Sequence, residues 1–333
     1  MAEQAASAEA LKEVTERVVA ELKKVIIGQD EAMEEVLIVF FAGGHCMITG
    51  VPGVAKTLLI ESLARLMELS FKRIQFTPDL MPSDITGTEI LEEDMTTGRR
   101  EMRFVPGPVF ANIVMADEIN RTPPKTQAAL LETMQERQVT LGGQTYPLEQ
   151  PTFVLATQIP FEQEGTYPLP EAQQDRFMFS VLMDYLGEDD EVTVIKGSTG
   201  LGKVELKPLM TKQELLAYQD VILKVEVPPR LVEYTVELVS SSRPENPDSP
   251  DFVKEYIQWG AGLRASQYIT LGAKSRAAMR GRMTVAPEDI EPVVPPVLRH
   301  RIGLSFRADV DRVTVEDIIE RLLERNPAPA AAG

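Results

Sequence analysis

The stretch Gly50-Val-Pro-Gly-Val-Ala-Lys-Thr57 has the residue types and spacing that bind phosphate. An apolar run at 45–49 precedes it and a run with helical spacing at 58–66 follows, which predicts a strand, a glycine-rich turn and a helix. The N–H groups of such a turn and of the helix N-terminus converge on phosphate oxygens. Lys56 would reach the β- and γ-phosphates of a nucleotide, and the hydroxyl of Thr57 would ligate Mg²⁺.

The P-loop pattern G-x-x-x-x-G-K-[ST] is matched at its first glycine, its lysine and its threonine, but Ala55 stands where the last glycine is expected. An ordinary Gly/Pro turn between a buried strand and a helix is therefore the alternative. In a P-loop, the residues that surround the phosphates would be Gly50, Pro52, Gly53, Val54, Ala55 and Leu58.

Two carboxylates end a second apolar run, at 111–118. Asp117 is suited to ligate Mg²⁺, and Glu118 could polarise the attacking water as a general base. Their separation from Lys56 fits two strands of one nucleotide-binding sheet. In isolation, an Asp-Glu pair after an apolar strand is more often a solvated strand end.

A third buried strand is predicted at 151–158, and it ends in the polar residues Thr157 and Gln158. At the carboxyl edge of the same sheet, the side chain of Gln158 could reach the γ-phosphate or the attacking water.

The segment before the P-loop could hold the base of a nucleotide. A first amphipathic helix is predicted at 8–24 and a second at 31–41, with a glycine turn between them. Ile26 and Ile27 in this turn would lie against an adenine ring. The alternative is a plain helix stop with two core isoleucines.

Two hairpins interrupt the predicted α/β pattern. The segment 88–104 has an acidic and a basic arm around a turn at 96–98, and the segment 138–148 alternates around Gly142-Gly143. The first hairpin is either a stable surface excursion or a loop that grips a partner.

Three segments together resemble the MoxR group of AAA+ ATPases: GVPGVAKT, VMADEINRTPPKTQAALLETMQE and FVLATQIPFEQEGTYPLPEAQQDRF. The resemblance covers roughly 26–326. It implies an α/β P-loop AAA+ core whose parallel sheet is flanked by helices, with two inserted β-hairpins and an all-α lid domain after it. It also implies ATP and Mg²⁺ as ligands, and a homo-oligomeric, hexameric ring whose pore the hairpins face. The implied partners are proteins, often with von Willebrand A domains, in chaperone-like or metal-cofactor assembly work.

The resemblance also implies roles for single residues. Lys56 and Thr57 match the phosphate and Mg²⁺ contacts, and Asp117 with Glu118 matches the Walker B pair. Two arginines are added to the site. Arg176 matches the arginine finger, which a neighbouring subunit supplies, although without the motif it would read as a salt-bridged surface residue. Arg264 resembles the sensor 2 arginine, a γ-phosphate contact from the same chain.

One residue departs from the family pattern. Ala55 is shared by MoxR-type P-loops, but Ile159 stands where the pattern Ala-Thr-Gln-Asn-Pro has the sensor 1 asparagine. An isoleucine cannot hydrogen-bond water or phosphate. Either Thr157 or Gln158 substitutes, or ATP is bound well and hydrolysed slowly.

The chain is long enough for two domains. We expect the nucleotide-binding domain at 1–186, the helical lid domain at 187–326 and a disordered tail at 327–333. Within the lid, the run Arg299-His300-Arg301 could face nucleotide or a subunit interface, but a solvated helix end is the favoured interpretation.

Composition limits the functions that remain. Lys+Arg 34 against Asp+Glu 51 gives a net charge of −17, which disfavours nucleic acid and so a DNA-directed motor. The single cysteine, Cys46, falls in a predicted buried strand, and neither a membrane span nor a secretion signal is apparent. A cytoplasmic ATPase fits best, and a nucleotide-gated scaffold with little hydrolysis is the alternative.

Overall fold

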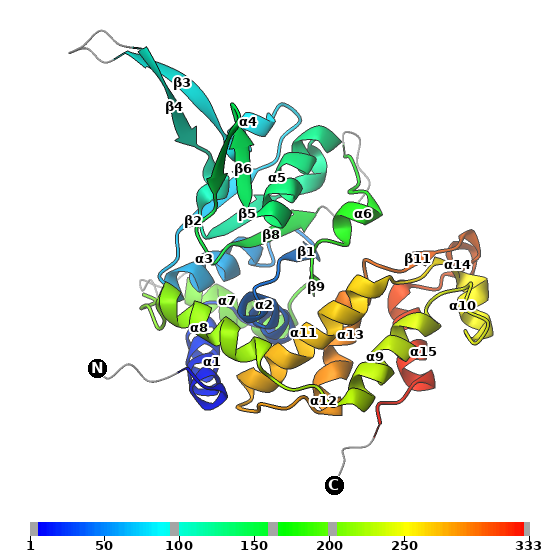
Figure 1. Cartoon of the computed structure of the whole chain (residues 1–333). Helices are drawn as coiled ribbons and strands as arrows, with labels where there is room; N and C mark the ends of the chain where they lie inside the picture. Colours follow the sequence, from blue (N-terminus) through cyan, green and yellow to red (C-terminus); the bar gives the residue numbers. More distant parts are fainter. Residues whose placement is uncertain (1–5, 94–99, 159–165, 199–204, 330–333) are drawn as a thin grey trace.

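A five-stranded parallel sheet organises the computed structural model, which describes residues 6–93, 100–158, 166–198 and 205–329. The strand order is β2-β5-β8-β1-β9 (Figure 1). Their apolar sequences are those of strands covered on both faces. These strands are β1 (Cys46–Gly50), β2 (Phe71–Gln75), β5 (Ile113–Asp117), β8 (Phe153–Gln158) and β9 (Phe179–Met183).

Because every strand runs in the same direction, the carboxyl ends share one edge. The register pairs Thr49 of β1 with Gln158 of β8, and Gln75 of β2 with Asp117 of β5. This edge therefore brings together the P-loop, the paired carboxylates and the third polar strand end, as predicted from the sequence.

Helices cover both faces of the sheet. The helices before β9 are α1 (Ala8–Leu22), α2 (Asp30–Ala42), α3 (Lys56–Leu66), α4 (Pro82–Thr86), α5 (Pro124–Glu136) and α6 (Glu171–Gln174), and α7 (Glu188–Ser198) follows β9. Cys46 is a buried free thiol in β1, as expected. Among the described helices, none is long and apolar enough to cross a membrane.

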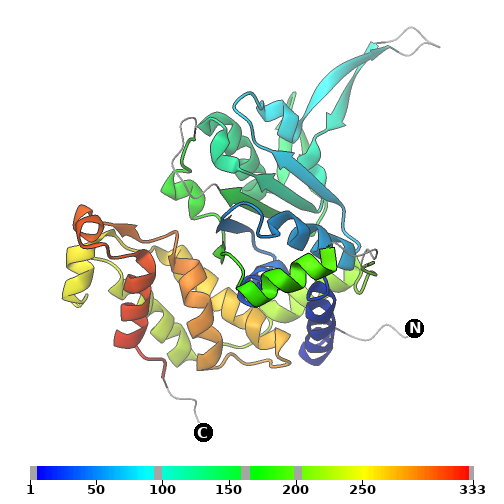
Figure 2. The same cartoon turned by 180° about the vertical axis from the view of Figure 1, so that it is seen from behind.

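The lid is helical, and its helices lie on the side of the sheet away from the hairpins (Figures 1 and 2). They are α8 (Lys212–Leu223), α9 (Pro229–Ser241), α10 (Asp251–Tyr256), α11 (Leu263–Met279), α12 (Pro287–Ile290), α13 (Val294–Leu298), α14 (Phe306–Asp311) and α15 (Val315–Arg325). A short antiparallel pair, β10 (Ile257–Trp259) and β11 (Gly303–Leu304), also occurs there, so the lid is not purely α-helical. The predicted boundary between 186 and 187 stays a prediction.

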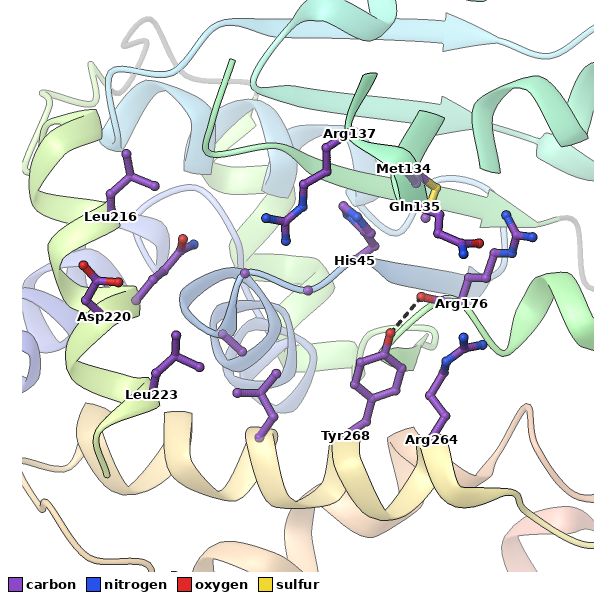
Figure 3. A pocket seen from close by; sticks show the side chains of 15 residues that line it. His45, Met134, Gln135, Arg137, Arg176, Leu216, Asp220, Leu223, Arg264 and Tyr268 are labelled. Carbon is purple, nitrogen blue, oxygen red and sulfur yellow. Dashed lines mark hydrogen bonds between the residues drawn. The ribbon is translucent and has the colours of Figure 1, made fainter. Parts of the chain in front are cut away.

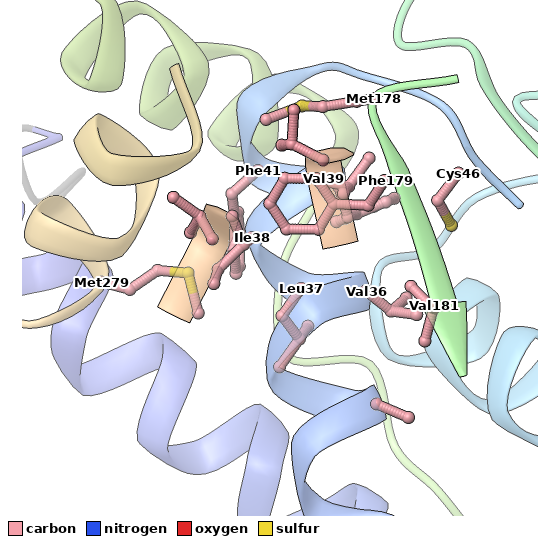
Figure 4. Packing of buried hydrophobic residues seen from close by; sticks show 14 of the residues in the cluster. Val36, Leu37, Ile38, Val39, Phe41, Cys46, Met178, Phe179, Val181 and Met279 are labelled. Atoms are coloured by element: carbon pink, nitrogen blue, oxygen red, sulfur yellow. The ribbon is translucent and has the colours of Figure 1, made fainter. Parts of the chain in front are cut away.

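The helix α2 joins the sheet to the lid. Its apolar side chains pack against β9 on one side and approach α11 on the other (Figure 4). Residues of the sheet, of α2 and of the lid therefore belong to one hydrophobic cluster. Hydrogen bonds reinforce the joint, since Ser275 Oγ donates to Ile38 O at 2.9 Å and Arg276 Nε donates to Glu34 Oε1 at 3.0 Å.

Both predicted hairpins form. β3 (Gly87–Glu93) pairs with β4 (Arg100–Pro106), and β6 (Gln138–Leu141) pairs with β7 (Gln144–Pro147), both antiparallel. The predicted turn at 96–98 lies outside the described residues. The β3–β4 hairpin projects far from the body of the molecule (Figure 1). At its base, the ring of Phe104 stacks on Tyr146 of the second hairpin with centroids 4.0 Å apart.

Candidate functional site

The P-loop backbone has the shape that its glycines predict. A Cβ atom at Gly50 would lie 2.2 Å from the carbonyl oxygen of Met183 in β9, so only glycine fits at the end of β1. Gly53 and Ala55 have φ angles of 90° and 63°. An L-residue in this left-handed region costs about 1 kcal/mol, which Ala55 bears immediately before α3.

Lys56 lies close to the two predicted Walker B carboxylates. Its Nζ donates a hydrogen bond to the carbonyl oxygen of Gly50 at 2.6 Å. Partial burial lowers the pKa of Lys56, while the charges of Asp117 and Glu118 raise it. Phosphate groups placed here would meet a mobile ammonium group and the N-terminus of α3, which is the donor set that a nucleotide needs.

Asp117 is held by two neighbouring strands. Thr157 Oγ1 of β8 donates to Asp117 Oδ1 at 2.6 Å, and Arg73 Nε of β2 donates to Asp117 Oδ2 at 3.0 Å. Thr57 and Asp117 are oxygen donors of the kind Mg²⁺ prefers, and the P-loop lies one strand beyond β8. The residues present therefore fit a metal ion that is shared with a nucleotide.

Glu118 is also fixed in place. Its N–H donates to Thr157 Oγ1 at 2.8 Å, and its backbone is left-handed, with a φ of 56°. Its Oε2 accepts hydrogen bonds from Gln75 Nε2 at 3.1 Å and from Arg121 Nη1 at 3.0 Å. These contacts orient the carboxylate at the tip of β5.

The contacts of Arg73, Gln75 and Arg121 were not anticipated from the sequence. The alternation in the predicted strand at 71–77 gave a weak signal, because Arg73 and Gln75 share one face of it. Recognising their role also needs the strand order, which puts β2 beside β5.

The two polar residues at the end of β8, Thr157 and Gln158, have different surroundings. Thr157 is buried, and its hydroxyl is already bonded to Asp117 and Glu118. Gln158 is half-buried at the end of β8 and stays a candidate for the role of the missing sensor 1 asparagine. Ile159 lies outside the described residues.

The two isoleucines before the P-loop differ in exposure. Ile26 is 1% exposed and belongs to the hydrophobic core, whereas Ile27 is half-buried. Gln29 Nε2 donates to Asp184 O at 2.8 Å, which fixes this turn at the carboxyl end of β9. Ile27 thus has surface to offer a base at the P-loop edge, and the predicted adenine contact of Ile26 does not fit its burial.

Arg176 and Arg264 lie at the other end of the sheet. Both line a cavity of about 640 Å³ together with His45 and Tyr268 (Figure 3). Arg176 Nη1 donates to Leu131 O at 3.0 Å. His45 directly precedes β1, whereas the P-loop follows it, and a strand of this length spans about 16 Å.

In this structure Arg264 lies away from the P-loop of its own chain, and its predicted γ-phosphate contact stays a prediction. Its Nη1 instead donates to Asp175 Oδ2 at 2.7 Å, directly beside Arg176. The reason is the position of α11: its first turn lies against the 175–178 segment and not against the P-loop.

Comparisons with known proteins agree with this geometry. A family model described as "ATPase family associated with various cellular activities (AAA)" matches residues 45–179, and an AAA lid domain model matches residues 251–322. The chain is 43% identical over 314 residues to "Chaperone MoxR1" of Mycobacterium tuberculosis, covering 94% of this chain and 82% of that protein. The chain belongs to the MoxR family of AAA+ ATPases.

Two further relatives extend the similarity. "Protein MoxR" of Methylorubrum extorquens is 29% identical and is covered over 93% of both chains. A crystal structure from Cytophaga hutchinsonii superposes with a TM-score of 0.88 at 40% identity, covering 97% of each chain. The predicted family and fold are thus confirmed, and family membership supports nucleotide binding and ATPase activity of a chaperone-like kind.

Proposed function

We propose that this MoxR-family ATPase forms a hexameric ring, binds Mg-ATP between subunits and uses hydrolysis to change the conformation of partner proteins. One observation carries the proposal: the P-loop and the pair Arg176 and Arg264 lie at opposite ends of β1. Each chain then has two halves of a site that cannot meet within it. A second copy of the chain, arranged head to tail, joins them.

At the P-loop edge, this chain binds the nucleotide. Lys56 exchanges its bond to Gly50 O for phosphate oxygens, and the N–H groups of 53–57 surround them. Thr57 and Asp117 would hold the metal, and Asp117 would then give up its bond to Arg73. Mg²⁺ neutralises charge on the phosphates when bound.

The attacking water is oriented by the carboxyl ends of β5 and β8. Glu118 accepts the proton of this water, since it follows Asp117 and its side chain is 33% exposed. Gln158 is the second group that can hold this water or the γ-phosphate. Hydrolysis is slow in this proposal, because Ile159 supplies no hydrogen bond.

The neighbouring subunit supplies Arg176 and Arg264. Guanidinium groups there stabilise charge on the transferring phosphoryl group. Arg264 lies close to Arg176 because it donates a hydrogen bond to Asp175, the residue before Arg176. Assembly is therefore required for turnover.

The proposed partner is a protein, and the resemblance points to a von Willebrand A-domain protein, with metal-cofactor assembly as the context. The projecting hairpin offers it a surface, since Leu91 and Met102 form a cross-strand pair and are 59% and 61% exposed. The net charge of −17 disfavours nucleic acid as the partner. A cytoplasmic location is part of the proposal.

A nucleotide-gated scaffold with little hydrolysis is the second candidate, and Ile159 favours it. Single-turnover hydrolysis by the assembled ring separates the two. A competent rate excludes the scaffold. A DNA-directed motor is the least favoured reading, and DNA-stimulated turnover at physiological salt would be needed to support it.

The decisive experiment mixes two inactive variants. Arg176→Ala keeps an intact P-loop, and Glu118→Gln keeps intact arginines, so each alone should bind ATP without turnover. In mixed rings about a quarter of the interfaces pair an intact P-loop with intact arginines, and activity should recover to about that fraction. If the mixture stays inactive while both variants assemble, the shared site is wrong.

A further inference from the structure

The backbone around Arg176 is held by the lid. Every carbonyl oxygen of the 175–178 segment accepts a hydrogen bond from a lid side chain. Arg301 supplies three of these bonds: its Nη2 donates to Asp175 O at 2.9 Å and to Phe177 O at 2.6 Å, and its Nη1 donates to Met178 O at 3.2 Å. The remaining carbonyl, that of Arg176, accepts from Tyr268 Oη at 3.3 Å (Figure 3).

Arg301 is buried, and all five of its N–H groups are used. Its side chain is 2% exposed. The other two donors go to Val297 O at 2.6 Å and to Asp175 Oδ1 at 2.7 Å. Its guanidinium also lies 5.1 Å from the ring centroid of Tyr268. The sequence favoured a solvated helix end for 299–301, and this is wrong because the backbone carbonyls take the place of water.

His300 adds a further bond to the same segment. Its Nε2 lies 3.0 Å from Phe177 O. Burial lowers the pKa of His300 well below its ordinary value, so the ring is neutral and Nε2 carries the proton that it donates. Three lid residues, Tyr268, His300 and Arg301, therefore bond to the four core-domain residues 175–178.

The side chain of Asp175 links this buried cluster to the cavity. Its Oδ1 accepts from Arg301, and its Oδ2 accepts from Arg264 at 2.7 Å. Arg264 is 42% exposed, so its free edge faces the cavity that Arg176 also lines. Arg301 thus acts on Arg264 through one carboxylate and on Arg176 through the backbone.

We propose that Arg301 is a positioning residue for ATP hydrolysis in the adjacent subunit. It fixes Arg176 and Arg264 relative to the lid, so that a shift of the lid in one subunit changes the hydrolysis rate of its neighbour. This inference rests on the proposed shared site. It also assigns a role to the segment Arg299-His300-Arg301, which takes no part in the reaction at the P-loop of its own chain.

The test is the variant Arg301→Gln, which is uncharged and retains two N–H donors. Its own P-loop is intact, so binding of a fluorescent ATP analogue should be unchanged. The kcat of its homomeric ring should fall about 100-fold, because small displacements of charge-stabilising groups have effects of that size. Mixing it with Glu118→Gln should restore activity, whereas mixing it with Arg176→Ala should not.

Arg276→Gln is the matched control, because Arg276 is a lid arginine that is 7% exposed and does not contact 175–178. It reports the cost of removing a buried lid arginine, and its kcat should fall far less. If Arg301→Gln fails to fold in a thermal melt, Tyr268→Phe removes only the bond to Arg176 O and should lower kcat about tenfold with the same recovery on mixing.

Three results would overturn the inference. These are an unchanged kcat in a folded Arg301→Gln or Tyr268→Phe ring, weakened binding of the analogue to the variant's own P-loop, and no recovery with Glu118→Gln. The third result counts against the inference only when a mixture of Arg176→Ala and Glu118→Gln does regain ATPase activity. If Arg176→Ala itself fails to recover, the shared site falls, and Arg301 loses its role with it.

Discussion

Arg73 on β2 and Asp117 on β5 form an ion pair across two adjacent strands, with Arg73 Nε 3.0 Å from Asp117 Oδ2. The pair occupies one oxygen of the carboxylate that we propose for Mg²⁺. Thr157 holds the other oxygen. A metal ion and Arg73 therefore compete for Asp117.

Replacing Arg73 should lower the Mg²⁺ concentration that ATP binding requires. In Arg73→Gln the carboxylate of Asp117 loses a competing cation, so the Mg²⁺ concentration that half-saturates ATP binding should fall several-fold. A titration of a fluorescent ATP analogue at fixed nucleotide measures it. Lys72→Gln removes the same charge from the neighbouring exposed position of β2 and should leave the titration unchanged. A weaker Mg²⁺ response in Arg73→Gln would contradict the competition.

Gly50 should be irreplaceable for a steric reason. In Gly50→Ala the new methyl group would lie 2.2 Å from Met183 O, and separating β1 from β9 should cost about 3 kcal/mol and abolish ATP binding. Gly187→Ala is the control, since its Cβ would meet no atom within 4 Å, and its stability should change by less than about 0.5 kcal/mol. Urea unfolding of both variants provides the comparison. Equal stabilities would refute the packing argument.

Stability should fall as the pH rises from about 5 to 8. Burial raises the pKa of Glu35 on α2 from 4.5 to about 8, helped by the charges of Glu31, Glu316 and Glu34 and opposed by Arg299. The folded protein then binds a proton that the unfolded chain releases above pH 4.5. This stabilisation is complete below pH 4.5 and is lost by about pH 8, up to about 5 kcal/mol.

Glu35→Gln should remove this slope. Its Tm should decline less than that of the unchanged protein between pH 5 and 8, measured by thermal melts at constant ionic strength. Glu13→Gln on α1 is the control for removing an acidic residue, since Glu13 is exposed and is not among the charges that act on Glu35. Identical slopes for Glu35→Gln and the unchanged chain would show that Glu35 is not protonated when folded.

Ile159 should limit turnover. Ile159→Asn supplies a hydrogen-bonding side chain at the position of the family's sensor 1 asparagine, and kcat should rise on the order of a hundredfold with nucleotide affinity unchanged. Steady-state ATPase assays of assembled protein measure this. The isosteric control Ile159→Leu should show no gain. If the asparagine variant also shows none, another residue fills the role.

The segments that form where the sequence predicts them are those with local signals. The P-loop, the Walker B pair and both hairpins follow from short patterns of glycine, apolar and charged residues, and the structure has these segments where the sequence predicts them. The parallel sheet was implied by the resemblance to AAA+ ATPases, which three short motifs carry. Such signals need no knowledge of long-range contacts.

The contacts that the sequence did not predict depend on residues far away in the chain. Arg301 was predicted to be solvated because a charged residue at a helix end usually is, and its partners at 175–178 are more than 120 residues away. Arg264 was assigned by resemblance to its own nucleotide, but the packing of α11 directs it to Asp175. Arg73 was not singled out, because its role depends on strand order.

The stack of Phe104 on Tyr146 has a mechanical consequence. The second hairpin follows α5 after a single residue, Arg137, and α5 itself begins six residues after Glu118. Arg176 donates to Leu131 O in the same helix. A force on the outer hairpin would thus reach α5 through two aromatic rings. This helix contacts Arg176, which we propose for the neighbouring subunit, and begins close to Glu118, the proposed general base of its own chain.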